Sequence, residues 1–349
     1  MSSLTPSAPD LTAFAATASA LAPTPVRRLV AVTGGANNRL FRVEDENGTA
    51  YALKAYLRDR SDTRDRIGRE CQGLSFLWRR GLRAVPRFVA LDAAAACALF
   101  SWVNGEPVGR AGARDIDAAL GFIRDLKGAA AHGEAAALQP AAEACLSGAA
   151  LVGQIEGRLA RLRQAARGNP VLASFLEDGI APRLASYGRA AETGFAAAGL
   201  SFDAPLPRAF QTLSPSDFGF HNALRTGGRN LVFLDFEYFG WDDPAKLVAD
   251  FLLHPGMRLG PAQKARFRSG AKAIFAADPA FSLRLRLFYP LFGLRWVAII
   301  LNEFLPERWH RRAFAGADDQ AAAAARQLAK AKRLLARLTA SNGGIPNDG

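Results

Sequence analysis

The chain contains few of the residue types that form disulfides or metal sites. Only three cysteines occur in 349 residues, and Cys71, Cys97 and Cys145 lie far apart without any Cys-x-x-Cys pair. This pattern argues against both a disulfide framework and a zinc site. No spacing typical of metal ligands is present among the four histidines, His132, His221, His254 and His310. We therefore expect a reduced, cytoplasmic protein.

Long apolar runs are also missing. The best candidate for a membrane span, residues 296–301, is far shorter than the roughly 18 continuous apolar residues that a span requires. The first 22 residues contain no Lys or Arg and no strongly hydrophobic run, so they do not resemble a secretory signal. We expect a flexible N-terminus over 1–25 with a short helix from about Asp10 to Leu21, and no membrane span.

Acidic residues are fewer than basic ones. The sequence has 44 Lys and Arg against 32 Asp and Glu, a formal net charge of +12. Such a surplus is typical of some nucleic-acid-binding proteins. Here most basic residues are Arg spread along the chain, and only residues 308–312 and 330–337 are concentrated. We expect no nucleic-acid partner. A basic nucleic-acid binder remains an alternative interpretation of the net charge.

One stretch, residues 211–250, combines polar residues with a turn in an unusual order. Asp217 is followed five residues later by Asn222, then by a turn at Gly227 and Gly228, and then by an apolar run that ends on Asp235. This order predicts a β-hairpin with polar residues at both ends. Such a hairpin directs two carboxylates and an amide into one cleft, although Asx residues also stabilise ordinary turns.

Phosphoryl transfer requires the groups that this stretch contains. One Asp orients the attacking hydroxyl or accepts its proton, while an Asn and a second Asp bind the metal ions that bridge the nucleotide phosphates. The spacing from Asp217 to Asn222 is that of the kinase catalytic loop, and Asp235 stands where a kinase has its metal-binding Asp.

In these motifs the chain resembles the aminoglycoside phosphotransferase and choline kinase-like family, the small-molecule branch of the protein-kinase-like fold. Members usually have His-Gly-Asp-x-x-x-x-Asn, then Asp-[Phe/Trp]-Glu, then Asp-Pro. The matching residues here are Asp217, Asn222, Asp235-Phe236-Glu237 and Asp243-Pro244, within a resemblance that covers about residues 26–310.

The chain departs from the family pattern at two places. Pro215 and Ser216 replace the His and Gly before the catalytic Asp, and Leu247 stands where the family has an Asp after Asp-Pro. In the family that Asp lies four residues after Asp-Pro, whereas here the next Asp is Asp250. The missing His is mainly a support for the loop, so its loss affects the expected rate more than the chemistry.

The N-terminal third predicts a β-meander with a glycine-rich turn. Weak alternation over Val26–Val32, a turn at residues 34–39, and strands from Leu40 and Thr49 give three strands. The resemblance implies that Gly34, Gly35 and Asn37 belong to a turn whose backbone N–H groups cover phosphates, although Gly-Gly alone also fits an ordinary hairpin.

Lys54 lies between apolar residues of the third strand, where an unpaired ammonium is costly. It therefore requires an anion. The resemblance implies that Lys54 binds the nucleotide phosphates and pairs with Glu70 on a helix predicted over Arg64–Trp78. The alternative for Glu70 is a solvated helix face.

Two further strands, Arg83–Leu91 and Ala96–Val103, lead into a helical region. The resemblance implies that Ser101, Trp102 and Val103 form the hinge whose backbone binds adenine. Apolar spacing predicts the later helices, and Pro290 is a candidate break in one of them: Asp115–Ala131, Ala141–Ala166, Pro170–Ala198, Pro261–Ala276, Ser282–Phe304 and Asp318–Thr339. The last has a basic face, which suits a core-packed helix or, as the alternative, a membrane-surface helix.

The predicted fold is α+β and bilobal, of the protein-kinase-like type. A small antiparallel β-sheet lobe over 26–103 precedes a larger helical lobe over 104–340, and 341–349 form a disordered tail. The resemblance implies an ATP-dependent phosphotransferase acting on a hydroxyl of a small molecule such as a sugar, aminoglycoside or amino alcohol. The positive charge of the chain favours recruitment of an anionic nucleotide.

In this interpretation Asp217 is catalytic, Asn222 and Asp235 bind Mg²⁺, and Lys54 and Glu70 serve the ATP phosphates. The alternative is a non-catalytic nucleotide-binding regulator on the same fold, which Pro215 favours. The sequence contains no motif that identifies the acceptor. Acidic residues near the site suit either attraction of a cationic acceptor or the capping of helices; they are Asp242, Asp243 and Glu303.

Overall fold

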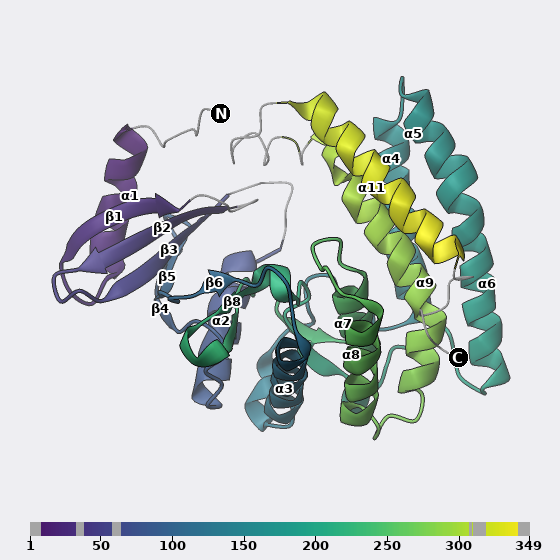
Figure 1. The fold of residues 1–349 in the computed structure, drawn as a ribbon, viewed down its shortest axis with the longest axis horizontal. Coiled ribbons are helices and arrows are strands. Elements are labelled where there is room, and N and C mark those ends of the chain that lie inside the picture. The colour runs from purple at the N-terminus through teal and green to yellow at the C-terminus, as the bar shows by residue number, and fades with distance from the viewer. Residues whose placement is uncertain (1–7, 33–37, 58–63, 307–308, 310–318, 341–349) are drawn as a thin grey trace.

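The computed structural model describes residues 8–32, 38–57, 64–306, 309 and 319–340, and these form two lobes (Figure 1). A β-sheet stands at one end of the long axis, and a group of long helices stands at the other. The two lobes of the expected α+β architecture are therefore separate in space.

The small lobe is built on one antiparallel sheet of five strands in the order β1-β2-β3-β5-β4. Two helices pack on this sheet, α1 (Ala8–Leu21) and α2 (Arg66–Arg79). The strands are β1 (Val26–Val32), β2 (Asn38–Asp45), β3 (Ala50–Tyr56), β4 (Phe88–Asp92) and β5 (Cys97–Ser101). The predicted meander is confirmed, and the two later strands are shorter than predicted.

Alternation along β3 divides its side chains between two environments. Tyr51, Leu53 and Ala55 belong to a small core beneath α1, whereas Lys54 and Tyr56 point to the opposite face. Successive side chains of a strand point to opposite faces, so the apolar packing of Leu53 directs Lys54 into the space between the lobes. Helix α1 is part of this packing, with Ala18 fully buried.

The large lobe is mainly helical, with short strands around the loop that contains Asp217. The strands form two small sheets, β6-β8-β9 and β10-β7, from β6 (Glu106–Pro107), β7 (Thr212–Ser214), β8 (Ala223–Arg225), β9 (Leu231–Phe233) and β10 (Gly240–Asp242). The helices are α3 (Ala113–Ala130), α4 (Gly148–Ala165), α5 (Pro170–Ser174), α6 (Ala181–Ala197), α7 (Pro244–Leu253), α8 (Pro261–Ile274), α9 (Phe281–Ile300) and α11 (Gln320–Ala340).

The helix predicted from Ala141 begins later, so this boundary was wrong. Helix α4 starts at Gly148, because the Ser147 side chain accepts a hydrogen bond from the Ala150 N–H at 3.1 Å and caps the first turn. The chain before it is tied to β10 instead, where the Ala141 N–H bonds to the Trp241 carbonyl at 2.8 Å. Residues 141–147 therefore form a loop at the edge of the cleft.

The candidate break at Pro290 is also wrong. Helix α9 continues through this proline, and its surface is buried against α4, α6, α7 and α11. Burial on several sides holds the helix together where Pro removes one backbone hydrogen bond. Among the described residues, the helical segment Phe281–Phe304 is long and apolar enough to cross a membrane, but 78% of that apolar window is buried inside the large lobe.

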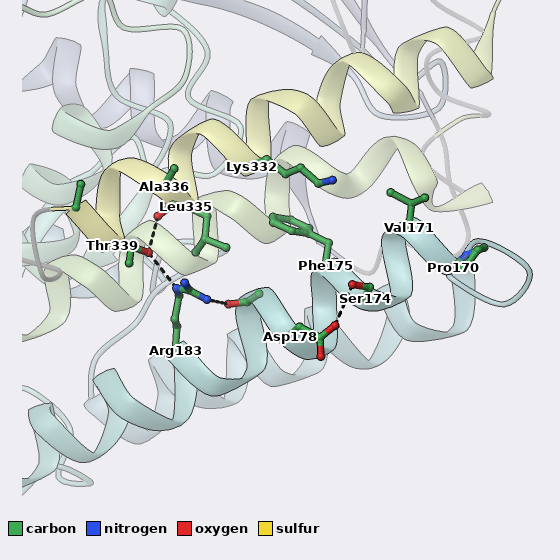
Figure 2. A pocket seen from close by; sticks show the side chains of 12 residues that line it. Pro170, Val171, Ser174, Phe175, Asp178, Arg183, Lys332, Leu335, Ala336 and Thr339 are labelled. Atoms are coloured by element: carbon green, nitrogen blue, oxygen red, sulfur yellow. Dashed lines mark hydrogen bonds between the residues drawn. The ribbon is translucent and has the colours of Figure 1, made fainter.

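The C-terminal helix is packed on the core, as the first of the two alternatives predicts. Ala331, Leu334 and Leu338 of α11 are buried, and α11 lies against α9. Between α11 and the helices α5 and α6 lies a groove of about 1000 Å³, in which Arg183 donates to the Thr339 hydroxyl at 3.0 Å (Figure 2). A π-helical turn over Phe175–Ile180 joins α5 to α6 beside it.

Candidate active site

A cavity of about 1050 Å³ lies between the two lobes and contains most of the predicted site residues. It is lined by Lys54, Glu70, Ser101, Trp102, Val103, Asp217, Asn222 and Asp235. The predicted residues Gly34, Gly35 and Asn37 lie outside the described part of the chain. Residues separated by up to 181 positions in the sequence are thus brought to one cleft.

Lys54 is the centre of the charged groups on the small-lobe side. Its ammonium lies 2.8 Å from Glu70 Oε2 and 2.7 Å from Asp235 Oδ1. Desolvation alone would lower the pKa of Lys54, but the charges of Asp235 and Glu70 raise it well above its usual value. The Tyr56 hydroxyl also donates to Glu70, at 2.5 Å, so the carboxylate is held on two sides. The predicted pairing of Lys54 with Glu70 is confirmed.

Glu237 adds a third carboxylate to this group. It is 1% exposed, and its Oε2 atom accepts a hydrogen bond from the Asn38 side chain at 3.0 Å. Lys54 lies 3.9 Å from the same oxygen, and Arg66 lies 3.7 Å from the other. The Asn38 contact joins the first residue of β2 to the large lobe, so Glu237 links the two sides of the cleft.

The loop that contains Asp217 runs from β7 to β8 and folds back on itself through Asn222. The Asn222 side chain donates to the Asp217 backbone carbonyl at 3.0 Å and to Asp217 Oδ2 at 3.2 Å. Its amide oxygen is therefore directed away from Asp217. The backbone is left-handed at Ser216 (φ 68°) and at Asp235 (φ 65°), a conformation that costs energy outside glycine. These two strained positions border the residues predicted to carry the chemistry.

Two histidines that the sequence interpretation did not assign lie against Asp217. His221 Nε2 is 2.9 Å from Asp217 Oδ1, and His254 Nε2 is 3.6 Å from the same atom. The two imidazole rings stack with their centroids 3.6 Å apart, and His254 packs edge-on against Trp296. The Asp217–His221 spacing of four residues was a local signal for one contact. The approach of His254, 37 residues away, had no local signal.

The histidines change the acidity of Asp217. Desolvation would raise the pKa of Asp217, but the hydrogen bond and charge of His221, the charge of His254 and the Asn222 bond lower it to about 2. Desolvation and the neighbouring His221 lower the pKa of His254 to about 4, so His254 is neutral near pH 7 and its charge acts on Asp217 only in acid. Asp217 is consequently a carboxylate across the physiological range.

Lys246 of helix α7 supports the loop that contains Ser216 and Asp217. It is fully buried, and its ammonium donates to the Ser216 hydroxyl at 3.1 Å and to Asp242 Oδ2 at 2.8 Å, with Asp250 Oδ2 at 3.2 Å. Asp242 and Asp250 raise the pKa of Lys246 against the effect of desolvation, so the ammonium stays charged. The loop that has Pro215 in place of the usual His is therefore supported by a buried ion cluster.

The acidic residues considered for a cationic acceptor have different environments. Asp242 is fully buried and pairs with Lys246, while Asp243 caps α7 and pairs with Arg284 at 3.0 Å. The capping interpretation is thus confirmed for Asp243, and neither residue lines the cleft. Glu303 does line it.

The oxygen atoms at the centre of the cleft fit a divalent cation. The Asn222 amide oxygen and the Asp235 carboxylate, which is 36% exposed, are hard ligands of the kind that Mg²⁺ prefers. Glu70, Asp235 and Glu237 also approach one another closely enough to hold a metal, but Lys54 already occupies the space between them. Asn222 and Asp235, which both line the cleft, thus have the ligand types of a divalent-cation site.

The predicted hinge follows β5 and lines the same cavity. The Ser101 N–H bonds to the Arg87 carbonyl at 2.8 Å, and the Trp102 N–H bonds to the Ala50 carbonyl at 3.1 Å. Within the described chain, the Val103 N–H has no hydrogen-bond partner. A ligand in this part of the cleft would find its backbone donor at Val103.

Sequence comparison shows the family. A sequence model of the phosphotransferase enzyme family matches residues 28–288, which is well over half of the chain, so this protein belongs to that family. No curated protein matches the chain significantly in sequence.

Solved structures with the same fold include small-molecule kinases. Choline kinase from Cryptosporidium parvum Iowa II is 11% identical with a TM-score of 0.60, covering 95% of this chain and 97% of that one. Choline kinase LicA from Streptococcus pneumoniae is 13% identical, with a TM-score of 0.56 and coverage of 94% and 99%. APH(2")-IIa in complex with gentamicin is 12% identical, with a TM-score of 0.60 and coverage of 98% and 100%. The bilobal protein-kinase-like fold is thereby confirmed.

Proposed function

We propose that this protein transfers the γ-phosphoryl group of ATP to a hydroxyl group of a small molecule. Its family and its structural neighbours support a small-molecule phosphotransferase. The observation that carries the proposal is the meeting of Lys54, Asp235, Asn222 and Asp217 in one interlobe cavity, with Lys54 2.7 Å from Asp235 and Asn222 3.2 Å from Asp217. These are the groups that position phosphates, metal and acceptor in phosphoryl transfer.

The nucleotide would lie on the small-lobe side of the cavity. Adenine would bond to the Val103 backbone, and the phosphates would lie near Lys54, which Glu70 holds in place at 2.8 Å. The fixed positive charge of Lys54 needs no reorganisation when the phosphates arrive, which favours transfer. The similar structure of amicoumacin kinase hAmiN contains AMP-PNP and Ca²⁺, which supports ATP and a divalent cation as cofactors.

Asn222 and Asp235 would hold Mg²⁺, using the amide oxygen directed away from Asp217 and the exposed carboxylate. A divalent cation held by these two residues would supply positive charge that offsets the charge on the transferred phosphoryl group. Desolvation raises the pKa of Asp235 despite the nearby Lys54, so a positive ion would also stabilise its ionised form.

Asp217 would orient the acceptor hydroxyl. A carboxylate with a pKa of about 2 is a weak base, so it serves mainly as a fixed negative acceptor for the hydroxyl proton. His221 on Oδ1 and Asn222 on Oδ2 fix the plane of this carboxylate. Orientation of this kind is a large part of phosphoryl-transfer catalysis, because the transition state needs little covalent assistance.

The alternative of a non-catalytic regulator rested on Pro215. Since Lys246 supports Ser216 in the same loop, the absence of the usual His no longer favours that alternative. The test is phosphate transfer from labelled ATP to a broad panel of sugars, aminoglycosides and amino alcohols, run beside direct ATP binding. Transfer to an acceptor supports the proposal, whereas ATP and Mg²⁺ binding without transfer to any acceptor would favour the regulator.

A further inference from the structure

Three arginines surround a single carboxylate at the large-lobe side of the cleft. Arg158 Nη2 lies 2.6 Å from Glu143 Oε2, Arg295 Nη2 lies 3.4 Å from the same oxygen, and Arg64 Nη1 lies 2.9 Å from Oε1. The four side chains come from α4, α9, the segment just before α2 and the loop before α4, and all line the cavity. Glu143 thus faces three positive charges, of which Arg295 is also paired with Asp250.

Arg158 has unused hydrogen-bonding capacity in this cluster. Its side chain is 9% exposed, and its only hydrogen bond within the described chain is the one from Nη2 to Glu143. Desolvation, opposed by Glu143 and increased by Arg295, lowers the pKa of Arg158, yet a guanidinium remains charged in proteins. Arg158 therefore has donors at Nε and Nη1 that make no hydrogen bond within the described chain, and because Arg158 lines the cavity these donors are available to an anion there.

Glu143 does not neutralise the cluster. Arg158, Arg295, Arg64 and Lys246 lower the pKa of Glu143 to about 2 against the effect of desolvation, so it is ionised and already shared. A guanidinium presents a planar fork of N–H groups that matches carboxylate or phosphate oxygens. A cationic group placed here would meet the surplus positive charge.

The cluster lies near the groups proposed for chemistry rather than near the hinge. Arg295 Nη1 lies 3.5 Å from Asp250 Oδ1, and the same oxygen accepts a hydrogen bond from Trp296 at 2.7 Å. Trp296 packs against His254, which in turn lies 3.6 Å from Asp217. The arginines therefore belong to the wall that would contact the acceptor.

We propose that the acceptor is a hydroxyl compound bearing an anionic group, a carboxylate or a phosphate, and that Arg158 binds this group with Arg64 and Arg295 beside it. This inference rests on the proposed phosphotransferase function and adds the charge of its acceptor. An anionic acceptor distinguishes this cleft from clefts that bind a cationic acceptor, because fixed guanidinium groups would oppose the binding of a cation.

The test is binding of simple anions to protein saturated with ADP and Mg²⁺, so that the nucleotide site is filled. Sulfate represents a phosphate group and malonate represents carboxylates, each titrated calorimetrically at constant ionic strength. We expect one of them to bind wild type, and Arg158→Gln to weaken that binding by roughly tenfold, the loss typical of a charge-assisted hydrogen-bond pair. Arg161→Gln, an exposed arginine one turn along α4, is the matched control and should bind as wild type does.

A second variant tests the opposite direction. Glu143→Gln removes the competing carboxylate, so we expect tighter anion binding than in wild type, and this variant decides the matter if Arg158→Gln does not fold. Anion binding that is absent from wild type, or equal in wild type, Arg158→Gln and Glu143→Gln, overturns the inference. ADP affinity measured on the same samples separates the two ideas: intact ADP binding without anion binding removes only the anionic acceptor, whereas loss of ADP binding in wild type contradicts the proposed function.

Discussion

The two sides of the cleft hold their charged groups by different means. On the small-lobe side, Lys54 pairs with Glu70, as the family resemblance implies, and also with Asp235. On the large-lobe side, the loop around Asp217 is supported by Lys246, 30 residues further along the chain, and by two stacked histidines. The groups proposed to contact phosphates and metal have the expected types. The groups that support the loop have changed, because a buried donor from another element makes the same kind of contact.

The largest effect is expected from removal of the Asp217 carboxylate, which lies on the large-lobe side of the cleft. Asp217→Asn keeps the shape of the side chain, and we expect turnover to fall by about 10²–10⁴-fold. ATP affinity should change by less than about threefold, because Lys54, Asp235 and the hinge lie on the other side. Steady-state kinetics and ATP titration measure both quantities. Equal turnover in wild type and mutant would show that Asp217 does not act on the acceptor.

Lys246→Met tests the support of the loop. The change leaves Asp242 and Asp250 buried with one partner fewer, so we expect a loss of about 3–5 kcal/mol in the free energy of unfolding. Denaturant unfolding measures this loss.

Ser216→Ala is the matched variant, because it removes only the contact to the loop and costs about 1 kcal/mol. If Lys246 positions the loop, Ser216→Ala lowers kcat while leaving the KM for ATP unchanged. A kcat equal to that of wild type would restrict Lys246 to a role in stability.

Lys54→Ala acts on the small-lobe side. We expect ATP to bind at least roughly tenfold more weakly, because a charge-assisted contact to the phosphates is lost while Glu70 and Asp235 remain. Calorimetric ATP titration measures the change, and circular dichroism checks that the variant is folded. The exposed Lys272→Ala on α8 is the control. Wild-type ATP affinity in Lys54→Ala would remove this lysine from the nucleotide site.

Asp235→Asn has the smallest expected effect. A neutral amide is a poorer ligand for a hard cation, so the Mg²⁺ concentration for half-maximal activity should rise by several-fold. A Mg²⁺ titration of the ATP-dependent reaction measures this shift, with Asp117→Asn, a carboxylate exposed on α3, as the control. An unchanged titration would place the metal elsewhere.

Local sequence spacing predicted much of the site. The interval from Asp217 to Asn222, the apolar strand before Asp235 and the alternation around Lys54 each act over a few residues, so the backbone geometry of a hairpin or strand decides where those side chains point. The role of Glu70 as the partner of Lys54 could be predicted from the sequence, because a buried lysine requires an anion and the next helix provides one.

Other features depended on packing between distant elements. The sequence by itself determined the kind of fold, the pairing of Lys54 with Glu70 and the order of the motifs. Only the tertiary structure brought His254 to Asp217, Lys246 to Ser216, and Arg158 and Arg295 to Glu143, across 37, 30, 15 and 152 positions. The physical reason is that a buried charged group needs only a partner of suitable charge at a short distance. Any element of the fold can contribute that partner, so its position in the sequence is not fixed.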